Sequence, residues 1–269
     1  MKVAIIGASG KSGKLLVKEC LEKGYQVVGV CRPVSVPKLD EFADRITIVP
    51  GLTSDREVIR QAVQGCAGVI TIIVAPGRRS TYATDTVRNV LEEAKDARLV
   101  FSGSGGASQI LEGETRSFRN RMEVALGGGI AWLFGLADIS DMLASTELIY
   151  ASDTRWTVVR GPWLKKGESQ GMPVTGSLGD PVVSAQEVRR VDFAKFMVAA
   201  LEDDSLVRKA LSFAKTWSGA NRTGHRAVSF TMTLPRRQKC VDVFGNCLCN
   251  EHDCRRSETV VSHRSAEGS

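Results

Sequence analysis

The chain has 269 residues, of which 43% are hydrophobic and 25% are charged, and its formal net charge is +6. This length and composition are typical of a folded globular protein with one large domain or two small ones, and they exclude a fully disordered chain, collagen and a coiled coil. No apolar run reaches the roughly 20 residues that a membrane-spanning helix needs. The segment Met1–Gly7 lacks the pattern of a signal peptide, so we expect a cytoplasmic protein with reduced thiols. Aromatic residues make up only 6% and no basic stripe interleaves with them, so we expect no nucleic-acid partner.

Apolar runs alternate between strand-like and helix-like spacing up to about residue 215. The strand-like runs are Lys2–Ile6, Gln26–Cys31, Ile46–Val49, Gly68–Val74, Arg98–Ser102, Trp156–Val159 and Ala210–Ala214. The helix-like runs are Ser12–Lys23, Asp55–Gln64, Thr81–Lys95 and Phe193–Leu201. Ser54 and Asp192 are expected to cap the second and the fourth of these helices, and Gly24 and Gly65 to end the first and second.

Strands that alternate with helices predict βαβ units and a parallel sheet. We therefore expect an α/β fold with a doubly wound parallel sheet, in a single domain of residues 1–218. Its ligand crevice is expected at the carboxyl ends of the strands, covered by loops in residues 103–129. Residues 219–269 lack the alternation and predict a basic, Cys-containing tail without regular structure.

A glycine-rich stretch follows the first strand and opens the first helix. It comprises Gly7, Ala8, Ser9, Gly10, Lys11, Ser12 and Gly13. In such a loop the first glycine permits a tight turn, the second lets the backbone approach a pyrophosphate, and the third lets the helix pack closely. The helix N-terminus then offers free N–H groups and a partial positive charge to phosphates. These seven residues are the predicted core of a dinucleotide site, in the context typical of a Rossmann-type domain.

The spacing Gly-x-x-Gly-x-x-Gly at the N-terminus resembles that of the atypical short-chain dehydrogenase/reductases. Among them, the NAD(P)H-binding group of the NmrA-like and the biliverdin reductase B or flavin reductase-like proteins is the most similar. Three later segments extend the resemblance: Ala62–Ile70, Trp156–Pro162 and Val188–Ala194. The resemblance implies the fold and the cofactor class and leaves the substrate open.

Arg32 follows the second strand, where this fold places the adenine ribose. An acid there binds the 2′-hydroxyl of NAD, whereas an arginine accommodates the 2′-phosphate of NADP, so the sequence favours NADP over NAD. The resemblance implies cofactor contacts for the residues after the fourth strand, which are Ala75, Pro76 and Gly77. It also places Ser102, at the end of the fifth strand, beside the nicotinamide, where its hydroxyl could bond a substrate or the carboxamide.

The chain departs from the family pattern at two points. The usual Gly-Asp after the third strand is replaced by Gly51-Leu52, which removes a hydrogen bond to adenine. The Tyr-x-x-x-Lys pair of the classical enzymes is absent, because no tyrosine is followed by lysine at the fourth position: Tyr25, Tyr82 and Tyr150 are followed there by Gly29, Thr86 and Thr154.

Two functions remain open at this point, while the missing tyrosine argues against a third, an isomerase or epimerase that keeps NAD bound. The first is an NADP(H)-dependent oxidoreductase that transfers hydride from nicotinamide to a small conjugated acceptor, such as a flavin or a quinone. The second is a non-catalytic NADP(H)-binding redox sensor of the NmrA-like type. The three histidines, at positions 225, 252 and 263, lie beyond the predicted domain, which excludes a Ser-His-Asp hydrolase within it. The spacing of Cys240, Cys247, Cys249 and Cys254 fits no paired zinc module, so we expect no metal site.

Overall fold

One mostly parallel sheet dominates the computed structural model, with its strands in the order β3-β2-β1-β4-β5-β6-β10-β8. The model describes residues 1–73, 80–104, 108, 110–111, 114, 138–178 and 187–213. The strands of this sheet are β1 (Lys2–Ile6), β2 (Gln26–Cys31), β3 (Ile46–Pro50), β4 (Gly68–Thr71), β5 (Arg98–Ser104), β6 (Arg155–Gly161), β8 (Thr175–Gly176) and β10 (Lys209–Phe213). Among the described strands of this sheet, only the β10–β8 pair is antiparallel. A separate two-stranded sheet joins β7 (Trp163–Lys165) to β9 (Glu187–Arg189).

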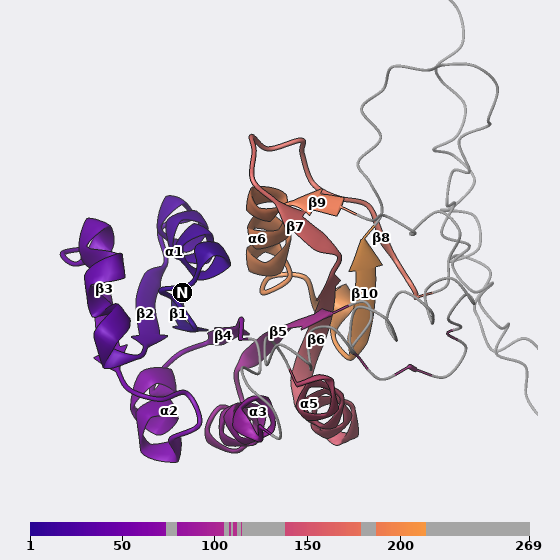
Figure 1. The fold of residues 1–269 in the computed structure, drawn as a ribbon, viewed down its shortest axis with the longest axis horizontal. Coiled ribbons are helices and arrows are strands. Elements are labelled where there is room, and N and C mark those ends of the chain that lie inside the picture. The colour runs from indigo at the N-terminus through magenta and orange to yellow at the C-terminus, as the bar shows by residue number, and fades with distance from the viewer. Residues whose placement is uncertain are drawn as a thin grey trace, which may run out of the picture. The chain divides into compact units, whose positions relative to one another are not determined.

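Helices cover both faces of the large sheet. They are α1 (Lys11–Glu22), α2 (Arg56–Val63), α3 (Tyr82–Glu93), α5 (Ile139–Ala151) and α6 (Arg190–Ala199), with 3₁₀ helices η1 (Pro33–Phe42) and η3 (Asp204–Leu206). In Figure 1, α1 and α6 lie on one side of the sheet and α2, α3 and α5 on the other. No helix in the described part of the chain is long and apolar enough to span a bilayer.

Each central strand contributes to two hydrophobic cores. In β1, Val3 and Ile5 belong to the core beneath α1 and α6, whereas Ala4 and Ile6 belong to the core on the opposite face. Because both faces are buried, the central strands are continuously apolar instead of alternating with polar residues. The predicted doubly wound α/β sheet is therefore confirmed.

The strand order reverses between β1 and β4, because the chain moves outward from β1 to β3 and then returns to build β4, β5 and β6 on the other side. In doubly wound sheets this switch point opens a crevice at the carboxyl ends of the strands. The loops after β1, β2, β3, β5 and β6 all meet at that edge, which positions the candidate site.

Two predicted helix caps are wrong. The cap of α2 is Asp55 and not Ser54, because the Asp55 carboxylate accepts a hydrogen bond of 2.9 Å from the Glu57 amide. Asp192 lies within the first turn of α6, which begins at Arg190, and accepts bonds from the Ser169 hydroxyl and the Gln170 amide. The Asp192 carboxylate thus bonds a loop that precedes the helix by about 20 residues, and the spacing of residues around Asp192 cannot predict this contact.

The sequence pattern also missed several elements. Helix α5 has apolar residues on most of its circumference, so it carries no helical periodicity to detect. Helix η1 contains Pro37, and β7, β8 and β9 have no more than three residues each. The fourth strand is shorter than predicted, since β4 ends at Thr71.

Candidate functional site

The turn after β1 is built around Gly7. Its φ of +95° lies in the left-handed region, and a Cβ atom there would lie 2.3 Å from the carbonyl oxygen of Ile72. The amides of Gly7 and Ala8 both donate to the carbonyl oxygen of Val30, at 3.0 Å each, which ties the loop to the end of β2. Only glycine satisfies both the turn and the close approach to the chain after β4.

Helix α1 begins directly after this turn, with Gly10 as its N-cap and no side-chain capping bond. Within the described part of the chain, the amides of Ser9, Lys11, Ser12 and Gly13 have no hydrogen-bond acceptor. These donors lie at the positive end of the helix dipole, which is the arrangement that binds phosphate. The loop therefore fits the pyrophosphate of a dinucleotide.

Gly10 and Gly13 differ in how much room the surrounding residues leave for a side chain. Gly10 has an ordinary φ of −71°, and a Cβ there would meet only the Gly7 carbonyl oxygen, at 3.4 Å. A Cβ on Gly13 would lie 2.2 Å from the Gly7 oxygen and 2.5 Å from the Ala8 oxygen. The structure thus requires Gly13 for packing α1 on the loop, whereas no atom of the described residues requires a glycine at position 10.

The side chains of the loop also differ in exposure. Ala8 is completely buried in the core beneath α1, so only its backbone faces the loop. Ser9 is half-buried and hydrogen-bonds the thiol of Cys31; burial raises the pKa of this thiol, and the bond to Ser9 opposes that rise. Lys11 is exposed at the first position of α1.

Arg32 lies at the carboxyl end of β2, one residue past the strand, and is exposed. The next strand is close by, because Cys31 pairs with Pro50 and the Gly51 amide donates to the Cys31 carbonyl oxygen at 2.9 Å. Leu52 therefore emerges beside Arg32 and is 52% exposed. Its neighbour Thr53 turns inward, buried against the Thr86 hydroxyl at 2.8 Å.

Ser102 lies near the end of β5, opposite Val159 of β6. It is half-buried, and its hydroxyl has no hydrogen-bond partner in the described residues. Strand alternation places it on the same face as Val100, which belongs to the core beneath α1 and α6. Its hydroxyl is thus free to bond a ligand at the carboxyl edge. Ala75, Pro76 and Gly77 lie outside the described residues.

None of the tyrosines is part of a Tyr–Lys pair. Tyr25 bonds the carboxylate of Glu202, and Tyr150 lies 3.0 Å from a guanidinium nitrogen of Arg160. Tyr82 occupies the first turn of α3, with Thr86 on the following turn. The Lys23 ammonium lies 5.9 Å from the centre of the Tyr25 ring, but burial and the bond to Glu202 raise the pKa of the Tyr25 hydroxyl, which opposes a role in proton transfer.

Sequence reasoning missed a pair of carboxylates that join α3 to α5. The Asp141 carboxylate of α5 accepts hydrogen bonds from the amides of Ala83 and Thr84, at 2.8 and 2.9 Å. Asp138 caps α5 and also accepts from the Ser80 amide at 2.9 Å. Hydrogen bonds from the Ser140 hydroxyl and from the amides of Ser80, Asp141 and Ser140 hold the pKa of Asp138 below its usual value. The available signal was the Asp138-x-x-Asp141 spacing before an apolar run.

A buried ion pair was missed as well. Both side chains are almost fully enclosed: Arg160 of β6 donates two bonds to Glu114, at 2.6 and 2.8 Å, and the two side chains are 0% and 5% exposed. Glu114 also accepts from the amides of Leu111 and Leu178. Burial raises the pKa of Glu114, but the bonds from Arg160 and the two amides outweigh it and hold that pKa below its usual value. This cluster anchors two chain segments to the end of β6.

Comparison with known proteins gives the family. A family model described as NAD(P)H-binding matches residues 7–204. The chain belongs to the NAD(P)H-binding family. This match begins at the first glycine of the loop and extends through α6, so it includes the crevice edge described above.

Two kinds of relative support this assignment. Cinnamoyl-CoA reductase 1 of Petunia hybrida is 33% identical over 118 residues, which are 39% of this chain and 35% of that protein. The chain thus spans about a third of the length of this curated relative. The short-chain dehydrogenase/reductase of Veillonella parvula, solved in complex with NADP, matches with a TM-score of 0.61 at 13% identity, over 80% of this chain and 95% of that one. A protein of Streptococcus pneumoniae assigned as an NADH-flavin reductase matches with a TM-score of 0.60 at 17% identity, over 80% and 99%.

These likenesses confirm the fold and the resemblance to the atypical short-chain dehydrogenase/reductases. The family model gives the cofactor class, NAD(P)H. One neighbour holds NADP and the other is named for NADH, so the choice between the two rests on the residues of this chain.

Proposed function

We propose that the protein is an NADP(H)-dependent oxidoreductase that passes a hydride to a small conjugated acceptor, such as a flavin or a quinone, without a Tyr–Lys proton relay. The observation that carries this proposal is that two sets of unbonded hydrogen-bond donors lie at the carboxyl edge of the sheet. Unbonded backbone amides at the start of α1 and a free hydroxyl on Ser102 lie at this edge, and no Tyr–Lys pair accompanies them among the described residues.

The residues of the loop would hold the dinucleotide. The amides of Lys11, Ser12 and Gly13 would bond the pyrophosphate, and Gly10 would let the backbone come close to it. Arg32 would pair with the 2′-phosphate of NADP, because its exposed guanidinium at the end of β2 has no carboxylate partner among the described residues. Val34 and Leu52, which are 79% and 52% exposed, would give the adenine ring apolar contact in place of the missing aspartate.

When bound, the reduced nicotinamide supplies a hydride. Ser102 would orient it or the acceptor by donating a hydrogen bond from the free hydroxyl at the end of β5. An electron-poor conjugated ring takes up the hydride without prior protonation and then receives its proton from water. A simple ketone needs an acid beside its oxygen in the transition state, and the described residues offer no activated tyrosine for this. The assignment of a structural neighbour as a flavin reductase supports the same class of acceptor.

Steady-state assays with NADPH test this function. We expect the protein to oxidise NADPH with riboflavin or a soluble quinone and to leave simple aldehydes and ketones untouched. Ser102→Ala should lower kcat/KM by about tenfold, the effect of one lost hydrogen bond to a ligand. Lys95→Gln, an exposed substitution in the loop before β5, is the matched control.

The sensor hypothesis predicts a different result in the same experiment. Tight binding of NADP and NADPH without turnover of any acceptor would contradict the enzyme and favour the sensor. Binding can be followed by tryptophan fluorescence, because Trp163 follows β6 and is 81% exposed.

A further inference from the structure

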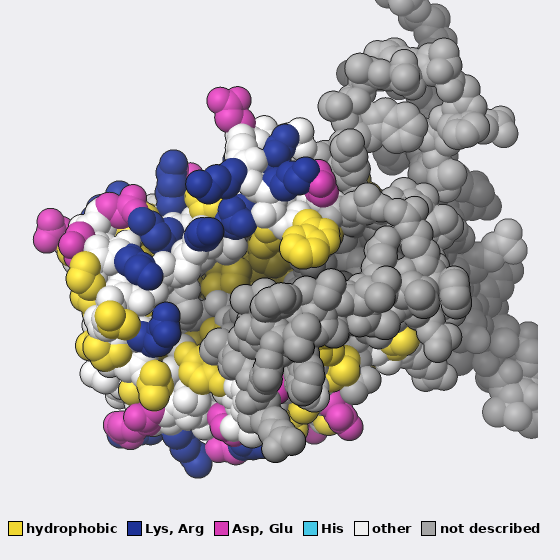
Figure 2. Space-filling view, viewed as in Figure 1, with side chains coloured by type: hydrophobic (Ala, Val, Ile, Leu, Met, Phe, Trp, Pro, Cys, Tyr) yellow, Lys and Arg dark blue, Asp and Glu magenta, His cyan; other side chains and the backbone are white. Residues whose placement is uncertain are grey.

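A basic pocket of about 450 Å³ lies beside the glycine loop, between α1, the end of β7 and the start of α6. Figure 2 shows that Lys and Arg side chains gather on this face of the molecule, over α1, α6 and β7. The cations that line the pocket are Lys11, Lys14, Lys18, Lys165, Lys166 and Arg190. Its apolar lining comes from Leu15, Phe42 and Val191. The pocket thus combines an apolar surface with a cationic rim.

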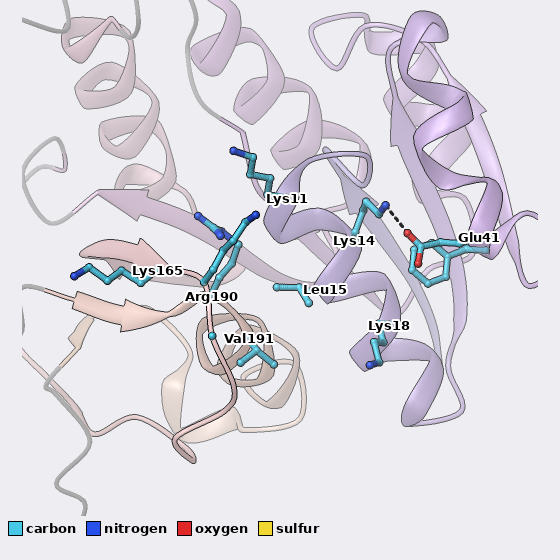
Figure 3. A pocket seen from close by; sticks show the side chains of 11 residues that line it. Lys11, Lys14, Leu15, Lys18, Glu41, Lys165, Arg190 and Val191 are labelled. Carbon is cyan, nitrogen blue, oxygen red and sulfur yellow. Dashed lines mark ion pairs between the residues drawn. The ribbon is translucent and has the colours of Figure 1, made fainter.

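Carboxylates neutralise only part of this charge. Lys14 pairs with Glu41, Lys18 with Glu22 and Lys165 with Glu187. Six cations therefore face three carboxylates, which leaves an excess of three positive charges. Figure 3 shows one paired and two unpaired cations: Lys14 points toward Glu41, whereas Lys11 and Arg190 extend from opposite walls of the pocket. Ion pairs at an exposed surface are weak, so even the paired lysines can turn toward an anion.

Arg190 is the best-positioned donor of the pocket. It is half-buried, and one guanidinium nitrogen donates to the carbonyl oxygen of Leu164 at 2.8 Å, which fixes the side chain. Its other nitrogens have no protein partner within the described residues, and neither do the ammonium groups of Lys11 and Lys166. A guanidinium that is already held in place loses little entropy when it bonds a phosphate.

The pocket adjoins the crevice because of the way the two helices begin. Both α1 and α6 start at the carboxyl edge of the sheet and pack against each other on the same face. Lys11 and Arg190 occupy the first positions of these helices, where the helix dipoles add to the positive potential. Lys166 directly follows β7 and Arg190 begins α6, whereas the proposed 2′-phosphate site at Arg32 directly follows β2.

We propose that this pocket binds the phosphate end of the hydride acceptor, so that the protein prefers a conjugated acceptor that carries a terminal phosphate monoester to its uncharged counterpart. This inference rests on the proposed function. A phosphate monoester is close to a dianion at neutral pH and bonds guanidinium and ammonium groups strongly. The apolar lining would contact the chain that joins the phosphate to the ring. Arg190, Lys166 and Lys11 are then specificity-determining residues.

Riboflavin and its 5′-phosphate, FMN, test this preference, since they share the same redox-active ring and differ only in the phosphate. We expect kcat/KM with NADPH to be about tenfold higher for FMN than for riboflavin, and the difference to shrink as salt rises. Lys166→Gln should reduce the FMN-to-riboflavin ratio several-fold, and Arg190→Gln should reduce it further. Lys95→Gln removes the same charge from an exposed loop at the amino end of β5 and should leave the ratio at its original value.

A binding measurement separates this inference from the proposed function. Quenching of flavin fluorescence, measured with NADP at saturation, reports the affinity for FMN and riboflavin whether or not turnover occurs. If FMN binds more tightly through Lys166 and Arg190 but no NADPH is consumed, the anion site stands and the oxidoreductase is wrong. Suppose instead that both flavins are reduced. If the FMN-to-riboflavin ratio of kcat/KM is then near one in the wild type, or if Lys166→Gln and Arg190→Gln leave it at the wild-type value, the anion site is wrong while the oxidoreductase stands. Failure of FMN to bind under these conditions also overturns the anion site.

Discussion

Replacing Gly10 by alanine separates cofactor binding from folding. The backbone at Gly10 has a φ of −71°, which alanine adopts freely, and the nearest atom of the described residues to the new Cβ would be 3.4 Å away. Alanine is a poorer N-cap than glycine by about 0.5 kcal/mol, and it restricts the unfolded chain by a similar amount. The two terms nearly cancel, so we expect the free energy of unfolding to change by less than about 0.5 kcal/mol.

Binding should respond very differently. If the pyrophosphate lies against Gly10, as the loop geometry suggests, the new methyl group occupies the space of a phosphate oxygen. Moving the dinucleotide away would weaken several charge-assisted bonds to the amides of Lys11 and Ser12. Weakening two such bonds by roughly 1 kcal/mol each corresponds to about a thirtyfold loss of NADPH affinity.

Gly13→Ala is the comparison variant, because its Cβ would lie 2.2 Å and 2.5 Å from two backbone carbonyl oxygens. Backbone cannot rotate away as a side chain can, so α1 must shift. Overpacking of this kind costs about 1–3 kcal/mol, and the better helix propensity of alanine returns up to about 1 kcal/mol. We expect a net loss of about 1–2 kcal/mol, or a Tm lower by about 2–8 °C, together with weaker NADPH binding.

Thermal unfolding followed by circular dichroism and a fluorescence titration with NADPH measure the two effects on the same samples. Gly24→Ala is a further control, since its φ of +75° imposes strain but no atom lies within 4 Å of the new Cβ. It should cost about 1 kcal/mol and leave NADPH affinity intact. Wild-type affinity in Gly10→Ala would refute the placement of the pyrophosphate, and wild-type stability in Gly13→Ala would refute the packing argument.

Three further predictions concern other parts of the crevice. Arg32→Glu should weaken NADPH binding by more than about tenfold and change NADH binding little; an equal loss for both in parallel titrations would show that Arg32 does not contact the 2′-phosphate. Asp141→Ala should lower the free energy of unfolding by about 1–2 kcal/mol, because the amides of Ala83 and Thr84 lose their acceptor, whereas exposed Asp96→Ala should change it by less than about 0.5 kcal/mol in the same urea titration. Glu114→Gln should cost about 3 kcal/mol, since it leaves the buried guanidinium of Arg160 without its carboxylate. The pKa of Glu114 is lowered in the folded state, so the carboxylate stabilises the fold above its ordinary pKa, and this stabilisation is lost as pH falls below about 4. The free energy of unfolding of Glu114→Gln should therefore fall less steeply with acid than that of the wild type. An equally steep fall in both proteins would contradict the ion pair's contribution to stability.

Local sequence patterns were sufficient for the parallel strands of the large sheet and for the glycine loop. The strands of β1, β2 and β4 are continuously apolar because both faces are covered, and the helices between them carry periodic apolar stripes that end at glycines such as Gly24. Gly7 and Gly13 follow directly from the geometry of a strand-to-helix turn, which is a short-range property. The family of the chain was accessible for the same reason, since its motifs are compact in sequence.

The elements that escaped prediction depend on contacts between distant residues. The carboxylate of Asp192 bonds Ser169 and Gln170, so its role depends on a loop 22 residues earlier that folds back onto α6. Helix α5 buries mostly polar side chains, namely Asp141, Ser145 and Thr146 beside Ile149, so it lacks the apolar periodic signal that marks an amphipathic helix.

The sequence by itself therefore determined the doubly wound α/β fold, the NAD(P)H-binding family and the position of the glycine loop. Only the tertiary structure decided which distant residues contact one another. It alone joined α3 to α5 through Asp141, enclosed Arg160 with Glu114, and assembled six cations from α1, β7 and α6 into one pocket. The physical reason is that hydrogen bonds and charge act over a few ångströms in space. Residues far apart along the chain meet at that distance only after the sheet has brought their helices together.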